Sequence, residues 1–220
     1  MTPTPTPAAA NAELDLYFFP TPNGQKITIM LEECELPYTV HLVHLGKGDQ
    51  FQAEYLKINP NNKIPSLVDR GAAGGPLTLF ESGAILWYLA EKTGRFCPPG
   101  LHGRYEVLKW VMWQMSGLGP AAGQASFFRS QPELSPPAVE RFTRECARLY
   151  GVLERTLTGG RQYLAGEYSI ADMACWTWVR QYERQGQDMT HFPQVQGWLG
   201  RIAARPAVQR GLAVGTELRR

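Results

Sequence analysis

Alternating and helical hydrophobic patterns follow one another in the first part of the chain. The run Leu14–Phe19 alternates as a strand does, and after a Pro- and Gly-rich turn the apolar side chains of Gln25–Glu35 recur at helical spacing. Pro37 ends that helix, and Tyr38–Val43 has the composition of a second strand. A strand, a crossover helix and another strand form a βαβ unit, so these two strands are expected to be parallel.

The pattern then predicts a hairpin and a further helix. The strands Ser66–Asp69 and Leu77–Phe80 are joined by a Gly-rich connection, and Ser82 is placed to cap the helix that follows. The order β-α-β-α-β-β-α is that of a compact α/β domain. The other expected elements are a loop at Gly46–Gln50, a short helix at Phe51–Leu56, and the last helix from Ser82 to about Lys92, ended by Gly94.

Beyond a Gly- and Pro-rich linker at residues 95–103, the pattern is helical and no strand is predicted. The run Leu118–Pro120 is expected to interrupt the first helix. The expected fold is therefore α/β followed by all-α, with a tail at 1–12, a first domain at 13–94 and a helical-bundle domain at 104–220. The predicted helices are Arg104–Gly117, Pro136 to about Leu157, Ser169 to about Gln185, and Pro193–Ala204.

Composition narrows the functional classes. Hydrophobic residues make up 44% of the chain and charged residues 19%, which excludes a wholly disordered protein. The formal net charge of +2, without a cluster of basic residues, gives no indication of nucleic-acid binding. No signal peptide or membrane-spanning run is found, so the cytoplasm is the expected compartment and no membrane partner is expected.

The cysteines and histidines are too scattered for metal or dithiol chemistry. Cys34, Cys97, Cys146 and Cys175 form no C-x-x-C pair, which argues against a zinc knuckle and against a self-contained redox centre. The histidines show no ligand spacing either, so no metal is expected. Free thiols in this number fit a reducing compartment.

The turn Pro20–Gly24 follows the first strand and precedes the first helix. Ligands of open α/β sheets bind at the carboxyl ends of strands, and a helix N-terminus favours an anion. Thr21 and Asn23 have side chains that can donate hydrogen bonds there. The same residues also fit a simple helix start in which Asn23 is the cap.

The dipeptide Ile64-Pro65 lies between a turn and a strand. A cis bond would offer the backbone of Ile64 to an extended ligand. A trans proline at the start of an edge strand is the commoner arrangement, and the residues alone favour it.

The run Glu81-Ser82-Gly83 ends a strand and begins a helix. The Ser82 hydroxyl and nearby N–H groups can bind a carboxylate, and Glu81 can bind an ammonium group beside it. The two together suit the head group of an α-amino acid, although ordinary capping explains them equally well.

The run Ser169–Asp172 is a capping box in which Asp takes the place of the commoner Glu. It precedes an apolar and aromatic helix. We interpret Asp172 as a folding residue and not as a catalyst.

Three motifs in this order resemble the cytosolic glutathione transferase family: Asn62–Ser66, Phe80–Ile85 and Ser169–Asp172. The resemblance extends from Leu14 to about Ala207. The runs Tyr17–Thr28, Leu45–Phe51 and Gly117–Pro120 resemble the bacterial nu class within that family. Nu-class proteins are similar to the yeast prion-forming nitrogen regulator and are associated with glutathione-dependent disulfide-bond reductase activity.

The resemblance implies a thioredoxin-like N-terminal domain, a helical C-terminal domain and a homodimer. It implies that glutathione is the cosubstrate and that Thr21 and Asn23 face its sulfur. Where well-known transferases carry a Tyr, Ser or Cys, this chain carries Thr-Pro-Asn. The other implied contacts are Ile64 with the glutathione backbone beside a cis Pro65, Glu81 and Ser82 with the γ-glutamyl end, Gln50 and Lys63 with the glycyl carboxylate, and Arg141, which reaches the same site from the run Ala138–Arg141.

The sequence therefore predicts a reductase of small disulfides in which the thiolate of bound glutathione is the nucleophile. Two alternatives remain open. One is transfer of glutathione to a hydrophobic electrophile, in a pocket lined by Trp113, Phe127 or Phe128. The other is a glutathione-binding regulator without turnover.

Overall fold

The computed structural model describes residues 12–133 and 135–216, which form two compact units. Among these residues, the first unit contains 12–93 and 205–216, and the second contains 94–204. The predicted tail at 1–12 lies outside the described residues except for Ala12. None of the described helices is long and apolar enough to cross a membrane.

A single mixed sheet forms the centre of the first unit, in the order β2-β1-β3-β4. β1 and β2 are parallel, whereas β3 is antiparallel to both β1 and β4. The predicted βαβ unit and hairpin are therefore confirmed. The strands are β1 (Leu14–Phe18), β2 (Tyr38–Leu42), β3 (Ser66–Asp69) and β4 (Leu77–Phe80).

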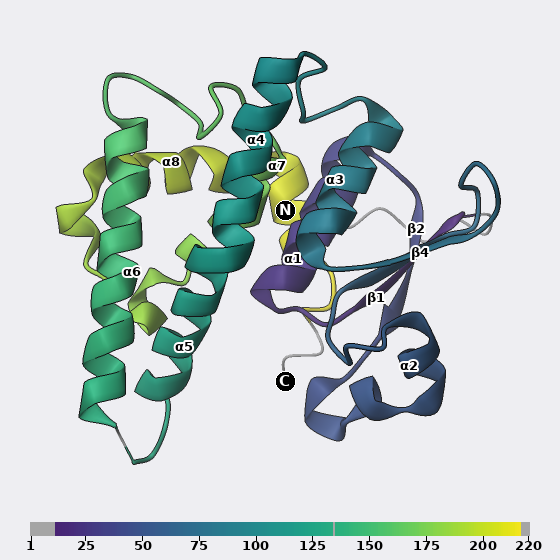
Figure 1. The fold of residues 1–220 in the computed structure, drawn as a ribbon, viewed down its shortest axis with the longest axis horizontal. Coiled ribbons are helices and arrows are strands. Elements are labelled where there is room, and N and C mark those ends of the chain that lie inside the picture. The colour runs from purple at the N-terminus through teal and green to yellow at the C-terminus, as the bar shows by residue number, and fades with distance from the viewer. Residues whose placement is uncertain (1–11, 134, 217–220) are drawn as a thin grey trace. The chain divides into compact units, whose positions relative to one another are not determined.

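Helices cover the sheet because alternate strand residues are apolar. Leu16 and Phe18 are fully buried, and the ring of Phe18 lies directly beneath the first turn of α1 (Pro22–Cys34). α3 (Ser82–Thr93) runs beside α1 (Figure 1). Tyr17 alternates with Leu16 and Phe18 along β1 and therefore points to the other face of the sheet. There its ring contacts the ring of Tyr55 in the short α2 (Ala53–Ile58). Two 3₁₀ turns, Leu45–Lys47 and Asp49–Phe51, occupy most of the predicted loop before α2.

The last described helix, α9 (Pro206–Ala213), packs against α1 in the first unit. Gly211 allows this close approach, because a Cβ there would lie 2.7 Å from the Cα of Ile29. The Thr28 hydroxyl donates a hydrogen bond of 2.8 Å to the Gly211 carbonyl. The sequence places residues 104–220 in the helical domain, so the return of the chain to the first unit is a difference from that expectation.

Two ion pairs strengthen the α1–α9 contact. Glu32 is fully buried, and the Arg210 guanidinium donates to it over 2.8 Å while the Tyr38 hydroxyl donates over 3.0 Å. Glu33 and Arg205 form a bidentate pair with distances of 2.6 and 2.9 Å. The buried carboxylates therefore depend on cations that the far end of the chain provides.

The second unit is helical, as predicted, but its first helix differs from the expectation. α4 (Leu101–Trp113) begins at Leu101 instead of Arg104 and continues through a π-helical turn, Gln114–Leu118, into α5 (Gly119–Arg129). The predicted break is wrong, because Pro120 lies in the first turn of α5, where no backbone N–H is needed. The remaining helices are α6 (Pro136–Leu157), α7 (Ile170–Val179), α8 (Pro193–Ala203) and the 3₁₀ turns Tyr182–Gln185 and Met189–His191.

The predicted capping box begins α7. The Ser169 hydroxyl accepts a hydrogen bond from the Ala171 N–H, and Asp172 accepts one from the Ser169 N–H over 3.1 Å. Asp172 also accepts from the Leu164 N–H over 3.0 Å and from the Trp198 indole over 2.9 Å. Complete burial raises the pKa of Asp172 to about 6, even though these donors favour its charged form. The structural role expected for Asp172 is confirmed.

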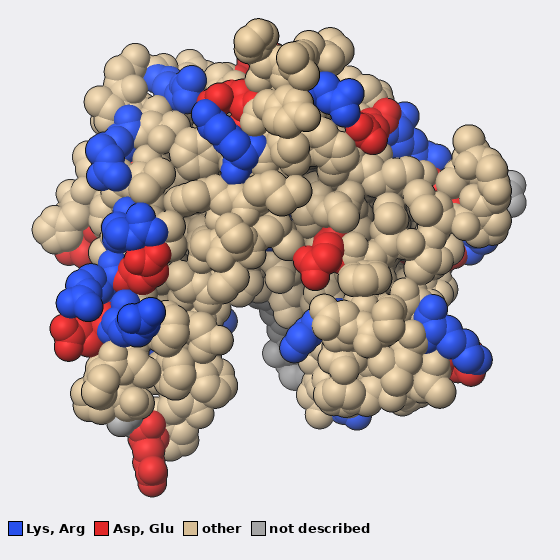
Figure 2. All heavy atoms as spheres, viewed as in Figure 1, with Lys and Arg blue, Asp and Glu red and all other residues tan. Residues whose placement is uncertain are grey.

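Charged residues of both signs intermingle on the visible face of the second unit, including the part formed by α6 (Figure 2). Glu145 and Arg148, about one turn apart on α6, form one such pair of opposite charges at 2.6 Å. No broad surface of one sign covers this helix on that face, which agrees with the small net charge of +2.

Candidate functional site

The pairing of the strands brings several predicted site segments to one edge of the sheet. Tyr17 pairs with Ser66, and Ser66 pairs with Phe80 in the next strand. The carboxyl ends of β1 and β4 therefore lie at the same edge as the amino end of β3. The turn after β1, the residues before β3 and the residues after β4 follow directly from these strand ends. This edge also receives the carboxyl end of β2, because β2 is parallel to β1.

Thr21 caps α1 at this edge. Its hydroxyl accepts a hydrogen bond of 3.3 Å from the Gly24 N–H, so the interpretation of Asn23 as the cap is wrong. Asn23 lies in the first helical turn and is half-buried. Gly24 is needed here, because a Cβ would lie 2.3 Å from the Phe19 carbonyl oxygen. The tight turn thus places Thr21 and Asn23 at a helix N-terminus, where an anion is favoured.

The bond between Ile64 and Pro65 is cis, so the trans arrangement that the residues alone favour is wrong. The carbonyl before Ile64 is held in place, since the Lys63 carbonyl accepts hydrogen bonds from the Tyr55 hydroxyl and, over 2.7 Å, from the Asn59 amide. The Lys63 side chain is exposed and Ile64 is half-buried. No sequence pattern indicates the roles of Tyr55 and Asn59, because they act across a turn through their side chains.

Glu81 and Ser82 follow β4. Glu81 has a φ of 73°, which is a left-handed conformation. Such a conformation costs a residue with a Cβ about 1–3 kcal/mol and is found most often at active sites and ligand-binding sites. The Glu81 carbonyl accepts from the Ile85 N–H over 2.9 Å, which puts Glu81 at the cap position and Ser82 at the first position of α3. The expectation that Ser82 is the cap is therefore wrong by one residue.

Lys26 is a residue of this region to which the sequence assigned no role. Its side chain is fully buried, and its ammonium group donates a hydrogen bond of 3.1 Å to the Ser82 hydroxyl oxygen. The sequence signal for such a residue is a lysine on a helix face that otherwise carries apolar residues. That signal is weak, because most lysines in such positions extend their ammonium groups to water.

Gln50 lies in the 3₁₀ turn Asp49–Phe51 after β2. Its side-chain oxygen is buried and has no hydrogen-bond partner among the described residues. Buried polar atoms are rarely left without a partner, so an unpaired one next to a candidate site is consistent with a bound polar ligand. This oxygen is an acceptor and would need a donor group of the ligand, so the expected contact of Gln50 with the glycyl carboxylate stays a prediction.

Arg141 belongs to the second unit. It is exposed and lies near the start of α6. Its expected contact with glutathione stays a prediction.

The cysteines do not contribute to the sheet edge. None of the four forms a disulfide, and none occurs in the segments that form this edge. Burial raises the pKa of the Cys146 thiol to about 12, which makes it a poor nucleophile. Cys34 is half-buried at the end of α1, with its sulfur 3.7 Å from the Thr93 hydroxyl oxygen. A thiol at this edge must therefore come from a bound molecule.

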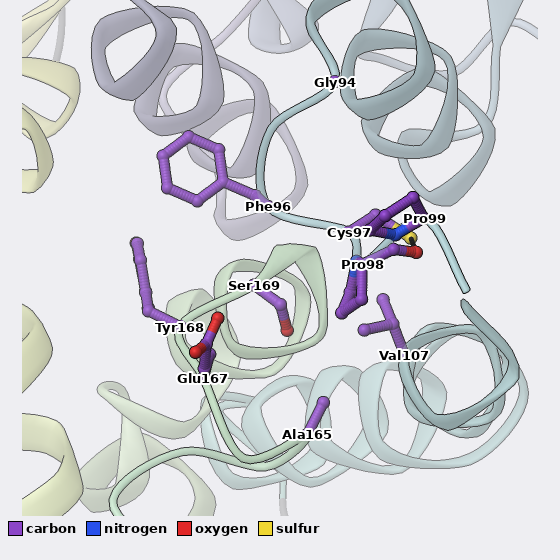
Figure 3. Close-up of a pocket in the computed structure, with 10 residues that line it drawn as sticks. All are labelled: Gly94, Phe96, Cys97, Pro98, Pro99, Val107, Ala165, Glu167, Tyr168 and Ser169. Atoms are coloured by element: carbon purple, nitrogen blue, oxygen red, sulfur yellow. Dashed lines mark hydrogen bonds between the residues drawn. The ribbon is translucent and has the colours of Figure 1, made fainter. Parts of the chain in front are cut away.

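Two cavities among the described residues contain none of the predicted site residues. A cavity of about 470 Å³ in the second unit lies beside Cys97, Val107 and Ser169, with Phe96 and Tyr168 in edge-to-face contact at 5.7 Å (Figure 3). A cavity of about 660 Å³ in the first unit lies between β2 and α2. The described residues contain no group of three or more His, Cys, Asp or Glu that could hold a metal ion.

Sequence comparison decides the family. The pattern of the glutathione S-transferase N-terminal domain matches residues 21–92, and that of the C-terminal domain matches residues 121–206. The chain belongs to the glutathione S-transferase family. Its thioredoxin-like first unit and helical second unit are the two parts of this fold, as the sequence predicted.

Relatives of this glutathione S-transferase resemble it over nearly their whole length. Disulfide-bond oxidoreductase YfcG of Escherichia coli (strain K12) is 52% identical over 203 residues, which cover 90% of this chain and 94% of YfcG. The crystal structure of a glutathione transferase from Burkholderia graminis has a TM-score of 0.89 and 46% identity, and covers 96% of this chain and 91% of its own. It holds two glutathione molecules per subunit.

A glutathione transferase from Pseudomonas putida has a TM-score of 0.88 and 43% identity, with 94% of each chain covered. Its crystal structure holds one glutathione disulfide per subunit.

Proposed function

We propose that this glutathione S-transferase is a glutathione-dependent disulfide-bond reductase. The observation that carries the proposal is the sheet edge, which brings together the predicted glutathione-binding segments and contains no cysteine. The 52% identity to an enzyme named as a disulfide-bond oxidoreductase supports the same activity. The two glutathiones, or one glutathione disulfide, in structural relatives support a site large enough for both reactants and product.

Each predicted residue has a proposed part in binding. The Ile64 backbone pairs with the cysteinyl residue of glutathione, as a peptide pairs with a strand edge. Glu81 binds the α-ammonium group, and Ser82 with the first N–H groups of α3 binds the α-carboxylate. Gln50 and Lys63 hold the glycyl end, and Arg141 is a further residue that the resemblance assigns to glutathione binding.

The reaction balances without any thiol of the protein. The glutathione thiolate attacks one sulfur of a disulfide substrate, so that a new S–S bond forms and the old one breaks to release a thiolate. A second glutathione thiolate then attacks the mixed disulfide, which yields glutathione disulfide and a second released thiolate. The two glutathiones lose two electrons and the substrate gains them. The released thiolates take up the protons that the glutathione thiols lost.

Thr21 and Asn23 favour the reactive thiolate. The Thr21 oxygen already accepts from the Gly24 N–H, so its hydroxyl hydrogen is directed elsewhere and can point toward the sulfur. Hydrogen bonds to an anion and the N-terminus of α1 both lower a thiol pKa from its usual value of about 8.5. More of the bound glutathione is then ionised at neutral pH.

The double variant Thr21→Ala/Asn23→Ala should reduce bis(2-hydroxyethyl) disulfide about 10²- to 10⁴-fold more slowly than the wild type, since it removes two hydrogen bonds to a charged group, each of which contributes about 1.5–3 kcal/mol. The rate is measured with glutathione, and glutathione reductase regenerates it. Thr158→Ala removes an exposed hydroxyl at the end of α6 and should leave the rate unchanged. Full activity of the double variant would refute the assignment.

The same assay separates the alternatives. A protein that conjugates glutathione to electrophiles would turn over 1-chloro-2,4-dinitrobenzene faster than the disulfide. A binding module would turn over neither, while still binding glutathione. We expect turnover of the disulfide, and we expect it in the cytoplasm, where reduced glutathione is plentiful.

We also propose that the protein is a homodimer. Leu101, Tyr105 and Met112 have exposed fractions of 69%, 62% and 57%, and their spacing puts them on one face of α4. Apolar side chains gathered on one exposed face are typical of a protein interface.

Met112→Glu should shift the protein from dimer to monomer in light scattering after size-exclusion chromatography, because it places a charge in this apolar face. Arg144→Glu changes an exposed residue of α6, away from this face of α4, and should remain dimeric. A wild-type protein that is monomeric at micromolar concentration would contradict the proposal.

A further inference from the structure

We propose that Lys26 is a positioning residue for glutathione, which acts through Ser82 on the α-carboxylate of the γ-glutamyl group. This inference rests on the proposed function and adds to it a residue buried behind the site. Lys26 has no exposed surface and Ser82 is 3% exposed, so both ends of this contact are buried. The 3.1 Å contact between them joins α1 to α3, the helices whose first turns lie at the sheet edge.

The hydrogen bond has only one possible direction. A lysine ammonium group has three donors and no acceptor, so the Ser82 oxygen must accept. The single hydrogen of the Ser82 hydroxyl is then directed away from Lys26. The geometry thereby orients Ser82 as a donor, which is the role that binding of a carboxylate requires.

The positive charge of Lys26 and the orientation of the Ser82 hydroxyl both favour binding of a carboxylate. A positive charge in a buried position is screened much less than one at the surface, so its attraction for a nearby carboxylate is stronger. A neutral hydrogen-bond donor at the position of Lys26 could orient Ser82 in part but would not supply this attraction. Positive charge at residue 26 is therefore the property that the proposal requires.

A purely structural role is the competing explanation, in which Lys26 only fastens α1 to α3. The two explanations differ in what they predict for ligands that lack the carboxylate. A loosened site would bind every glutathione-like ligand less well. Loss of the Lys26 charge should weaken only the ligand that carries the α-carboxylate.

The experiment uses two ligands and calorimetry. Glutathione is compared with 4-aminobutanoyl-cysteinylglycine, which keeps the ammonium group, the amide and the thiol but lacks the α-carboxylate. The wild type should bind glutathione at least about tenfold more tightly than this analogue, since hydrogen bonds to charged groups have that magnitude. Equal affinity of the wild type for both ligands would overturn the proposal before any variant is made.

The variants separate charge from packing. Lys26→Met and Lys26→Gln remove the charge, one with an apolar chain and one with a neutral donor, and both should lose most of the preference for glutathione. Lys26→Arg keeps the charge and should retain it. Lys57→Met removes a lysine that is 69% exposed and paired with Glu54, and should bind both ligands as the wild type does.

The outcomes are distinct. If either folded neutral variant still binds glutathione more tightly than the analogue by the wild-type factor, the role of Lys26 is overturned. The same conclusion follows if the affinities for both ligands fall by the same factor. If the neutral variants do not fold, Lys26→Arg and the wild-type comparison decide, because loss of the preference despite a retained charge contradicts the proposal. A wild type that binds no glutathione at all would instead overturn the proposed function.

Discussion

Arg210→Ala is expected to lower the free energy of unfolding by about 3–5 kcal/mol, because it leaves the charge of a buried glutamate without its cation. Glu32 has no exposed side-chain surface, and Arg210 is its ion-pair partner from α9 at 2.8 Å. Glu32 also accepts a hydrogen bond from the Tyr38 hydroxyl, but this donor is neutral and cannot replace a charge. Urea denaturation followed by circular dichroism measures the loss.

The matched control is Arg148→Ala in the helical unit. The pair of Arg148 and Glu145 has a similar distance, 2.6 Å, but its side chains are 60% and 40% exposed. Water screens such a pair, so the expected change is about 0–1 kcal/mol. Equal effects of the two variants would show that burial of Glu32 is not what makes its partner important.

Asp172→Ala is the second substitution with a large expected effect, a loss of about 3–5 kcal/mol in the free energy of unfolding. The carboxylate is completely buried and accepts hydrogen bonds from Ser169, from the Leu164 N–H and from the Trp198 indole. Its removal leaves these donors buried without an acceptor. Chemical denaturation at neutral pH gives the size of the loss.

Asp188→Ala is the corresponding exposed control. Asp188 also caps a helical turn, through a 2.9 Å hydrogen bond from the Thr190 N–H, but water can replace that contact. Its effect should be clearly smaller than that of Asp172→Ala. Comparable losses would contradict the importance of burial at Asp172.

The pH dependence of stability gives a second test that uses the variant Asp172→Ala. The pKa of Asp172 is about 6 in the folded protein and near 3.9 in an unfolded chain, so the folded state holds the proton more tightly. The contribution of Asp172 to stability therefore falls as pH rises from about 4 to about 6. The difference in unfolding free energy between wild type and Asp172→Ala should be larger at pH 4 than at pH 7, and a difference that grows with pH would contradict this.

Features that depend on local pattern could be predicted from the sequence. The alternation of Leu14–Phe19 and the helical spacing after it are enough to predict the βαβ unit, and the hairpin follows from the Gly-rich connection between two short apolar runs. The capping box at Ser169–Asp172 is equally local, since its partners lie within one turn. Such features need no knowledge of the rest of the fold.

Features that depend on distant partners could not be predicted. Gly119 and Pro120 are typical of a helix break, yet the preceding helix continues through a π-helical turn and the proline occupies a first turn where it is tolerated. Charged residues of α1 such as Glu32 are typical of a solvated face until the cations of α9 are known. The same holds for Lys26, whose partner Ser82 belongs to another helix.

Within the candidate site, the local geometry differs from what the sequence predicted. Thr21 and Ser82 were expected near the ligand, but the sequence did not distinguish Thr21 from Asn23 as the cap or show that Ser82 lies one position inside its helix. The cis bond before Pro65 was not favoured by the residues alone. A shift of one residue at a helix start changes which N–H groups face a ligand, and only coordinates resolve it.

The return of α9 to the first unit has a consequence for synthesis of the protein on the ribosome. The first unit is discontinuous, with the whole helical unit inserted between its two segments. The nascent thioredoxin-like segment emerges first, but it lacks the cations for Glu32 and Glu33 until Arg205 and Arg210 have been translated. The part that we propose binds glutathione thus leaves the exit tunnel before the helical unit but is completed only after it.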